Sequence, residues 1–286
     1  MEKVGWLIYD QAGARRNQTY ISMHIEEGKK LGIEVQLLYA EKFFFGVKNQ
    51  TVIVYYNQRK VTLPDFIICR TINPELSFML EQTKVPLFNQ AKVAKIANNK
   101  AKTYAFFCGK GIPMADAVFL TAKQLAAEWD TIGENFVIKA VAGHGGTQVF
   151  LKQEQDKMHI LNAIGNSDVV IQPLVPGGKD VRVYVLGNEI LAAVCRTAKE
   201  GFKSNYSLGG DVALYPLSEE NVCLVKKIVK QLSFGLVGID FLIDEQGKFW
   251  FNEIEDVVGA RMLYQLTSIN LVKRYLQFIL KKIETI

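Results

Sequence analysis

The sequence predicts an α/β (α+β) protein, in which an N-terminal βαβ domain precedes a mainly β region. Two patterns support this fold class: strand and helix signals alternate through the first ninety residues, and residues 136–255 carry one short apolar run after another. Alternation at this pace is typical of parallel βαβ units, whereas consecutive strands with turns between them form antiparallel sheets. The chain has 286 residues, 49% of them hydrophobic, which is enough for about two domains.

The N-terminal elements each have their own signal. A helix is expected over residues 18–31, where apolar residues have helical spacing and Gly32 then breaks the pattern. A second helix is expected from Pro74, a residue suited to a first helical turn, and residues 11–18 are polar and predict a loop. The apolar runs predict strands at 4–10, 33–40, 51–56, 59–64 and 65–70, with 51–56 and 59–64 forming a β-ribbon.

The later elements are mostly strands. One helix is expected over residues 91–110, interrupted by the polar patch at 98–100, and two more at 219–233 and 262–283. Turn signals separate several of the strands, for example at Gly187. The predicted strands are 136–141, 147–152, 168–175, 180–186, 189–196, 237–243 and 248–255.

The composition excludes several classes of protein. No uncharged stretch approaches the ~18 residues of a membrane helix, and the start of the chain lacks the features of a secretory signal. We therefore expect a cytoplasmic protein with no membrane partner. The four cysteines are scattered without a CxxC pair, which argues against zinc and disulfides. The net charge of +5 is spread along the chain, so we expect no nucleic-acid binding; a mild positive balance also suits a small anionic ligand.

The first candidate site is the glycine-rich segment VIKAVAGHGGTQVFL at 137–151. A strand that carries Lys139 leads into a loop with Gly143, Gly145 and Gly146, and a second strand follows. Such loops let backbone N–H groups approach phosphate oxygens, and a fixed lysine adds a positive charge. The alternative is a flexible hairpin tip with a surface lysine, and the segment alone does not decide between the two.

The second candidate is a set of carboxylates in the hairpin of residues 237–255. If Asp244 pairs with Phe249, Asp240 lies opposite Glu253, and both share one face of the sheet with Glu255. The apolar residues Ile239, Phe241, Ile243 and Trp250 then form the other face. Three carboxylates on one face repel one another unless a cation lies among them, and hard oxygen ligands suit Mg²⁺. The alternative is a solvated acidic face.

The third candidate is the polar stretch of residues 196–211, which interrupts the β region. It carries Arg196, Lys203, Ser204 and Asn205 before a pair of glycines. Cations and amides on a loop can orient an anionic ligand. An exposed connecting loop is the alternative interpretation.

Together, and in this order, the three segments resemble the ATP-grasp superfamily and, within it, the RimK-like group of carboxylate–amine ligases. The similarity covers nearly the whole chain, and residues 180–205 form its most specific stretch. The resemblance implies an N-terminal domain followed by a two-subdomain ATP-grasp fold, divided as 1–95, 96–171 and 172–286. The motifs that carry it are NNK (98–100), VIKAVAGHGGTQVFL (137–151), residues 171–205, VGIDFLI (237–243) and FNEIE (251–255).

The resemblance also assigns roles to single residues. The positions that match phosphate-binding and lid residues are Lys100, Lys139, Gly145, Gly146, Lys203, Ser204 and Asn205. The positions that match the adenine-lining segment and a nearby nucleotide-binding acid are Pro173, Leu174 and Asp180. Arg182 and Arg196 match arginines that orient the acyl phosphate or its carboxylate. The metal ligands correspond to Asp240, Glu253 and Glu255, where Glu255 replaces the asparagine of the family's usual Glu-x-Asn pattern.

The resemblance implies ATP-dependent amide formation through an acyl phosphate, with ATP and Mg²⁺ bound and Mn²⁺ as an alternative metal. The carboxylate substrate would be glutamate or another amino acid, and the amine would belong to a peptide, a protein terminus or a carrier; a homo-oligomer is compatible with the sequence. Two other functions remain open at this point. One is an ATP-grasp kinase that phosphorylates a small-molecule hydroxyl, and the other is a non-catalytic ATP-binding regulatory protein.

Overall fold

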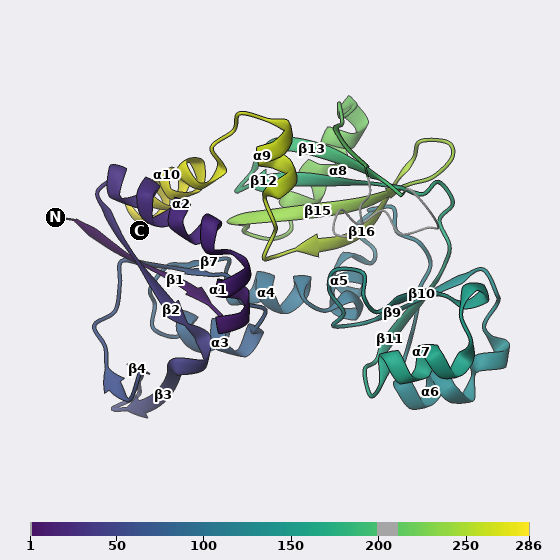
Figure 1. Cartoon of the computed structure of the whole chain (residues 1–286), viewed down its shortest axis with the longest axis horizontal. Helices are drawn as coiled ribbons and strands as arrows, with labels where there is room; N and C mark the ends of the chain where they lie inside the picture. Colours follow the sequence, from purple (N-terminus) through teal and green to yellow (C-terminus); the bar gives the residue numbers. More distant parts are fainter. Residues whose placement is uncertain (1, 199–210, 286) are drawn as a thin grey trace.

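The structure is a computed structural model and describes residues 2–198 and 211–285. Within these residues the chain forms four sheets, and the three larger ones follow one another along the long axis of the molecule (Figure 1). The N-terminal sheet lies at one end, a five-stranded sheet lies beside it, and a smaller four-stranded sheet lies at the other end. The predicted α/β class is confirmed. None of the helices in the described residues is long and apolar enough to cross a membrane.

The first sheet is parallel throughout, as the βαβ pattern predicted. Its strands, in spatial order, are β2 (Ile33–Tyr39), β1 (Lys3–Tyr9), β6 (Phe66–Cys69) and β7 (Leu87–Phe88). Helix α2 (Gln18–Lys30) covers one face, where it shares a core with Leu7 and Phe66. Helix α3 (Pro74–Glu81) and a β-ribbon cover the other face, where Trp6 and Ile67 are buried. Burial on both faces explains why these strands are continuous apolar runs.

The loop expected at residues 11–18 is wrong, because helix α1 (Gln11–Arg16) occupies most of it. Asp10 directly follows β1, and its side chain accepts a hydrogen bond from the Gly13 N–H at 2.6 Å. A capping carboxylate satisfies an amide that the first helical turn leaves unpaired. The cap therefore allows a polar stretch with no clear helical periodicity to form a short helix.

The predicted β-ribbon exists with a different main partner. Strand β4 (Thr51–Tyr56) pairs along its length with β3 (Phe43–Lys48), which the sequence analysis missed. The expected strand 59–64 is reduced to β5 (Arg59–Lys60). Asn49 and Gln50 form the two-residue turn with positive φ angles. The run FFFGVK is rich in strand-forming aromatic residues, so this signal was present in the sequence.

The helix expected over residues 91–110 is two helices, α4 (Ala91–Ala97) and α5 (Lys100–Phe107). The side chain of Asn99 caps α5 by accepting a hydrogen bond from the Lys102 N–H. The polar patch is therefore a junction between two helices, and it places Lys100 in the first turn of α5.

The four-stranded sheet at the far end is antiparallel. Its strands, in spatial order, are β10 (Val149–Leu151), β9 (Phe136–Ala140), β11 (Val169–Pro173) and β8 (Val118–Leu120). Helices α6 (Ala122–Ala127) and α7 (Lys157–Ile164) pack on it through Leu125 and Ile160. Both helices and β8 were missed, since elements of three to eight residues are too short to show periodicity. Three short 3₁₀ helices complete the described connections: η1 (Ala40–Lys42), η2 (Trp129–Thr131) and η3 (Lys152–Glu154).

The five-stranded sheet is also antiparallel and carries most of the charged side chains of interest. Its strands, in spatial order, are β14 (Asp211–Leu214), β13 (Glu189–Thr197), β12 (Lys179–Leu186), β15 (Leu236–Ile243) and β16 (Phe249–Glu255). Helix α8 (Glu219–Val229) packs against its apolar face through Val225 and Ile228. On the opposite face, Asp180 and Leu242 lie across a cavity from Val137 of β9.

The hairpin of β15 and β16 has the predicted register at its centre, because Asp240 lies opposite Glu253. The expected pairing of Asp244 with Phe249 is wrong: Phe249 pairs with Ile243, and the register shifts by one residue before Glu253. The extra residue on β16 is Asn252. A β-bulge of this kind adds one residue to one strand and redirects the side chains around it.

The bulge also changes one side of the predicted apolar face. Trp250 pairs with Leu242 and is half-buried on the face opposite Phe241. Its indole N–H donates to the Asp244 carboxylate at 2.8 Å. Phe249 and Phe251 take the apolar positions beside Phe241 instead.

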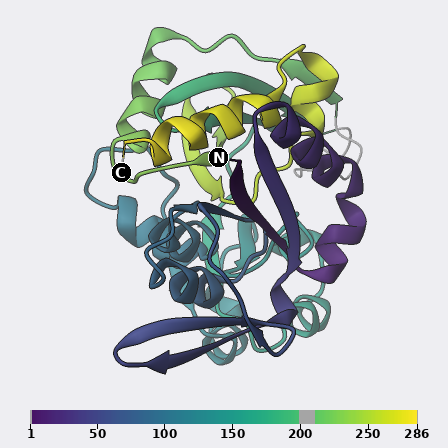
Figure 2. The ribbon, with the colours of Figure 1, turned by 90° about the vertical axis from the view of Figure 1, so that its left-hand side faces the viewer.

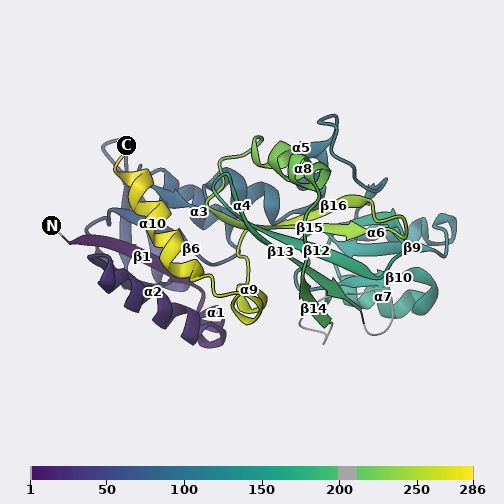
Figure 3. The ribbon, with the colours of Figure 1, turned by 90° about the horizontal axis from the view of Figure 1, so that it is seen from above.

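The C-terminal helix expected over residues 262–283 is divided into α9 (Arg261–Leu266) and α10 (Leu271–Ile283). Asn270 caps α10 by accepting from the Lys273 N–H. Figures 2 and 3 show α10 returning to lie beside α2 of the N-terminal sheet. Leu271 and Tyr275 share a core with Ile21, so the end of the chain packs on its beginning.

Candidate active site

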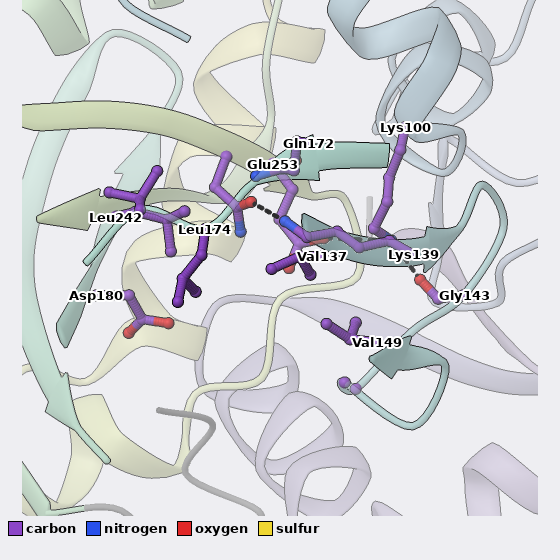
Figure 4. A pocket seen from close by; sticks show the side chains of 14 residues that line it. Lys100, Val137, Lys139, Gly143, Val149, Gln172, Leu174, Asp180, Leu242 and Glu253 are labelled. Atoms are coloured by element: carbon purple, nitrogen blue, oxygen red, sulfur yellow. Dashed lines mark hydrogen bonds and ion pairs between the residues drawn. The ribbon is translucent and has the colours of Figure 1, made fainter. Parts of the chain in front are cut away.

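A cavity lies where the β9–β11 sheet faces the five-stranded sheet (Figure 4). It brings together residues from four distant parts of the chain, including seven that the resemblance assigned to the site. These seven are Lys100, Lys139, Gly145, Gly146, Leu174, Asp180 and Glu253. Val137, Val149 and Leu242 give the cavity apolar walls, which can pack against a flat ring. Among the assigned residues of the described chain, Pro173 is exposed at the end of β11 and does not line the cavity.

Two lysines point into the cavity from different elements. Lys139, in the middle of β9, is 8% exposed, and its Nζ donates to Asn252 Oδ1 at 2.8 Å. Lys100, at the start of α5, donates to the Gly143 carbonyl at 2.5 Å and lies 3.5 Å from a Glu253 oxygen. Burial lowers the pKa of Lys139 to about 8, with the Lys100 charge adding to this and Glu253 opposing it. The cavity therefore has the cations that phosphate groups require.

Asn252 is a site residue that the sequence analysis missed. It lines the cavity and orients Lys139, although it lies next to Glu253 in the chain, where strict alternation would place it on the other face. The β-bulge at Asn252 allows neighbouring residues to serve one site. The sequence contains no local signal for this bulge.

The glycine-rich loop closes one side of the cavity. Gly145 and Gly146 have φ angles of 66° and 74°, a region that favours glycine. Lys100 holds this loop through the Gly143 carbonyl. Burial lowers the pKa of His144 in the same loop, with Lys100 contributing. Lys203, Ser204 and Asn205, which the resemblance also assigned to the site, lie outside the described residues.

A buried network of charges adjoins the cavity on the polar face of the five-stranded sheet. Arg182 donates to both carboxylate oxygens of Asp240, from Nε at 2.8 Å and Nη2 at 2.6 Å, and to Glu255 at 3.1 Å. Arg196 donates to Asp180 at 2.5 and 2.7 Å and to Asp240 at 2.7 Å. Asp240 is 1% exposed. Three carboxylates and two guanidinium groups thus share one site with a net negative charge.

Burial and pairing act in opposite directions on these acids. Burial alone would raise the pKa of Asp240, but Arg182 and Arg196 lower it to about 2. Burial raises the pKa of Asp180 despite its bonds to Arg196. Burial also raises the pKa of Glu255, and repulsion from Glu253 and Asp240 adds to this while Arg182 opposes it. Asp180 and Glu255 are therefore the carboxylates of the network whose negative charge burial disfavours.

The acids have the spacing and chemistry of a metal site. Ligand oxygens of Asp240, Glu253 and Glu255 all lie within 4.8 Å of one another. The side chains of Glu253 and Glu255 are 28% and 26% exposed, so they are more open to an ion than Asp240. Oxygen ligands in this arrangement fit a hard divalent cation such as Mg²⁺. The residues present therefore fit the group that the sequence analysis expected.

A second feature missed by the sequence analysis links β16 to the junction of helices α4 and α5. Asp256 is 7% exposed; its Oδ1 accepts from Asn89 at 2.7 Å and its Oδ2 from Asn98 at 3.0 Å. Asn89 also donates to the Leu236 carbonyl at the start of β15. The end of the N-terminal sheet, the junction that precedes the helix of Lys100 and the β15–β16 hairpin therefore meet at one carboxylate.

A comparison with protein families matches residues 97–279 to the RimK-like ATP-grasp domain. Among curated proteins, the chain is 30% identical over 285 residues to the uncharacterized protein MG011 of Mycoplasma genitalium, covering 96% of this chain and 92% of that protein. It is 28% identical to human N-acetylaspartylglutamate synthase A (71% of this chain, 56% of the synthase). It is 26% identical to a probable alpha-L-glutamate ligase of Legionella pneumophila (69% and 68%). The chain thus spans little more than half of the human synthase.

Solved structures have the same fold at low sequence identity. D-alanyl-alanine synthetase A from Vibrio cholerae superposes with a TM-score of 0.69 at 15% identity, covering 99% of both chains. The ATP-grasp ligase PsnB, complexed with a variant of its minimal precursor, Mg and ADP, superposes with a TM-score of 0.69 at 12% identity, covering 98% of this chain and 99% of PsnB.

Proposed function

The chain belongs to the RimK-like ATP-grasp family, whose members include ATP-dependent carboxylate–amine ligases, and from this premise we propose that it forms an amide bond through an acyl phosphate. One observation carries the proposal: Lys100, Lys139 and Glu253 converge on a single apolar-walled cavity beside a buried carboxylate cluster. Two cations and a candidate metal ligand at one point are the groups that phosphoryl transfer uses.

The nucleotide would lie in this cavity. The base would pack between the apolar walls near Leu174, while Lys139 and Lys100 would contact the phosphates as charge-assisted donors. Glu253 and Glu255, with Asp240 behind them, would hold Mg²⁺, which would neutralise phosphate charge when bound. Because Lys100 contacts both Glu253 and the Gly143 carbonyl, nucleotide binding and loop position would be linked through this lysine.

The reaction would proceed in two steps. A substrate carboxylate oxygen attacks the γ-phosphorus of ATP, ADP leaves, and an acyl phosphate forms; the amine nitrogen then attacks the acyl carbon, phosphate leaves, and the amide loses a proton. Lys139 and Lys100 would stabilise the transferring group. Arg182 and Arg196 are paired with carboxylates here, so their role in orienting the acyl phosphate stays a prediction. The loop of residues 143–146 would exclude water, which hydrolyses acyl phosphates.

We further propose glutamate as one of the two substrates, supported by the names of the human synthase and the Legionella ligase. A peptide, a protein terminus or a carrier-bound amine remains the proposed acceptor if glutamate supplies the carboxylate. We propose that the protein acts in the cytoplasm, where both ATP and Mg²⁺ are abundant.

Hydroxylamine trapping tests the reaction. With ATP, Mg²⁺ and each amino acid in turn, the acyl phosphate should be intercepted as a hydroxamate of defined mass, and ADP should form with it. The Lys139→Met variant is the control, because it keeps the cavity walls and removes one phosphate-binding cation. A stable phosphoester product would identify a kinase instead, and tight ATP binding without turnover over the whole panel would identify a regulatory protein.

A further inference from the structure

Arg70 lies outside the cavity, at the carboxyl ends of the strands of the parallel N-terminal sheet. It directly follows β6, and the neighbouring strand β1 ends at Tyr9 on the same edge. In open parallel sheets, ligands bind in the crevice outside the carboxyl ends of the strands. The guanidinium reaches across from this edge to the segment that follows the metal strand, where Nη2 donates to the Val258 carbonyl at 2.9 Å.

Arg70 is buried without an ion-pair partner among the described residues. The side chain is 7% exposed, its Nε has no hydrogen-bond partner, and no carboxylate of the described residues lies within ion-pair distance. A guanidinium offers five N–H donors, and a buried cation is costly when it is unpaired. Arg182 and Arg196, which are buried to a similar degree, each bind two carboxylates.

The side chains around Arg70 also include buried polar atoms without a hydrogen-bond partner. Four buried side-chain atoms of the described chain have no hydrogen-bond partner: Arg70 Nε, the hydroxyls of Tyr9 and Tyr20, and His24 Nε2. Arg70 lies 5.2 Å from the centroid of the Tyr20 ring, and the Tyr20 and His24 rings are 4.6 Å apart. Tyr9 is close enough to Arg70 to affect its pKa. All four atoms therefore belong to one cluster, which suggests a missing group.

The missing group is an acceptor with negative charge. The two tyrosine hydroxyls and the guanidinium can all donate hydrogen bonds. Burial lowers the pKa of His24 to about 4 and keeps its ring neutral. Because His24 Nδ1 donates to the Tyr20 carbonyl at 2.8 Å, its Nε2 is an acceptor and does not contribute to binding an anion. Asp256 is the nearby carboxylate, but both of its oxygens already accept from Asn89 and Asn98. A carboxylate matches the planar fork of a guanidinium and accepts from hydroxyls as well.

The cluster is connected to the metal site through the chain that follows it. Val258, the residue that Arg70 binds, lies three positions after Glu255. Tyr184 donates to the Gly259 carbonyl at 2.9 Å, and on β12 it lies two residues beyond Arg182. A molecule seated at Arg70 would thus adjoin the segment that leads from the metal ligands.

We propose that Arg70, with the hydroxyls of Tyr9 and Tyr20, binds a carboxylate group of a substrate, a group distinct from the one that reacts. The substrates would then include an amino acid or a dicarboxylate, held between the N-terminal sheet and the segment at Val258. That this ligand is a substrate rests on the proposed function; that the site binds a carboxylate does not. Because Arg70 Nε and the hydroxyls have no access to solvent, the Val258 segment must move to admit the ligand.

The first test measures thermal stability without ligand. Arg70→Met keeps the length of the side chain and removes the unpaired charge, so the melting temperature should stay the same or rise. Arg182→Met is the matched control, and it should lower the melting temperature by several degrees because it leaves Glu255 without its cation and Asp240 with Arg196 alone. A fall for Arg70→Met as large as that for Arg182→Met would show that Arg70 is a structural residue and would overturn the proposal.

The second test measures binding by calorimetry in the presence of Mg²⁺ and ADP. The probes are L-glutamate, L-glutamine and L-isoglutamine, which lacks the α-carboxylate. The wild type should bind L-glutamate, and its affinity for one of the two amides should be at least tenfold weaker than its affinity for L-glutamate. Arg70→Met should weaken L-glutamate binding at least thirtyfold and abolish the preference, with ADP affinity unchanged.

Two other results of the binding test would refute the proposed carboxylate site. L-Glutamate binding that Arg70→Met leaves unchanged would mean that a buried water satisfies the cluster, and the proposal would be wrong. Failure of the wild type to bind any of the three probes would refute it too. Neither arm uses turnover, so glutamate binding through Arg70 is established or refuted independently of hydroxamate formation, and failure of the ligase test would leave this site standing.

Discussion

Glu255 offers the sharpest test of the carboxylate site, because it departs from the Glu-x-Asn pattern of the family. It accepts one hydrogen bond from Arg182 at 3.1 Å and lies within 4.8 Å of the ligand oxygens of Asp240 and Glu253. Glu255→Asn restores the family pattern, keeps a side-chain oxygen as a ligand and removes one negative charge.

The magnitude follows from these distances. With an effective dielectric constant of about 20, attraction to Arg182 is worth about 5 kcal/mol and each of the two repulsions at least ~3.5 kcal/mol. The repulsions together exceed the attraction by roughly 2 kcal/mol, in the direction of the raised pKa of Glu255. The metal-free Glu255→Asn protein should therefore be as stable as the wild type or more stable, with a gain of roughly 2 kcal/mol.

Although Glu255→Asn should not destabilise the metal-free protein, it should weaken the binding of Mg²⁺. Removing a residue that hydrogen-bonds to a metal ligand commonly weakens metal affinity by about 10- to 100-fold. Replacing a ligand carboxylate should weaken it at least as much. The assay compares melting temperatures in EDTA with those in Mg²⁺ and ADP, and titrates Mg²⁺ against hydroxamate formation. Glu255→Asn should need about tenfold more Mg²⁺ and remain active.

Glu253→Ala serves as the contrasting variant and should be nearly inactive, because Glu253 is the acid that faces both the cavity and Lys100. The reasoning fails if Glu255→Asn lowers the metal-free melting temperature by several degrees, or if neither variant changes the Mg²⁺ requirement. Equal inactivity of the two would give Glu255 a role beyond ligation.

Three further predictions concern the nucleotide site. Lys139→Met should weaken ADP binding by about 1.5–3 kcal/mol in calorimetry without lowering the melting temperature; affinity within threefold of the wild type would contradict this. Since the pKa of Lys139 is about 8 rather than 10.5, ADP affinity should fall as pH rises above 8, and Lys139→Met should lack this fall. Between pH 8 and 10.5, Lys139 binds a proton in the unfolded state but has largely lost it in the folded state. The contribution of Lys139 to the free energy of unfolding should therefore increase as the pH rises through this range. Asn98→Ala should reduce the gain in ADP affinity that Mg²⁺ provides, because Asn98 links Asp256 to the helix of Lys100; Asn73→Ala, which uncaps α3, is the control and should reduce stability alone.

The sequence by itself determined the features that depend on local periodicity. Short apolar runs predicted most strands, and the side-chain period of two along a strand placed Asp240 opposite Glu253 on a polar face. The glycine-rich loop after Lys139 could be recognised for the same reason, since a strand, a flexible turn and a second strand are adjacent in the chain. The order of these motifs was enough to identify the family.

Only the tertiary structure decided which charges meet. Lys100 and Lys139 come from different elements, and Arg182 and Asp240, which pair, lie 58 positions apart in the chain. Asn252 enters the site through a bulge, and Arg70 is recognisable as unpaired only once its neighbours are known. Local patterns encode which way a side chain points along a strand or helix, whereas packing between distant segments determines its partners, its burial and thus its charge state.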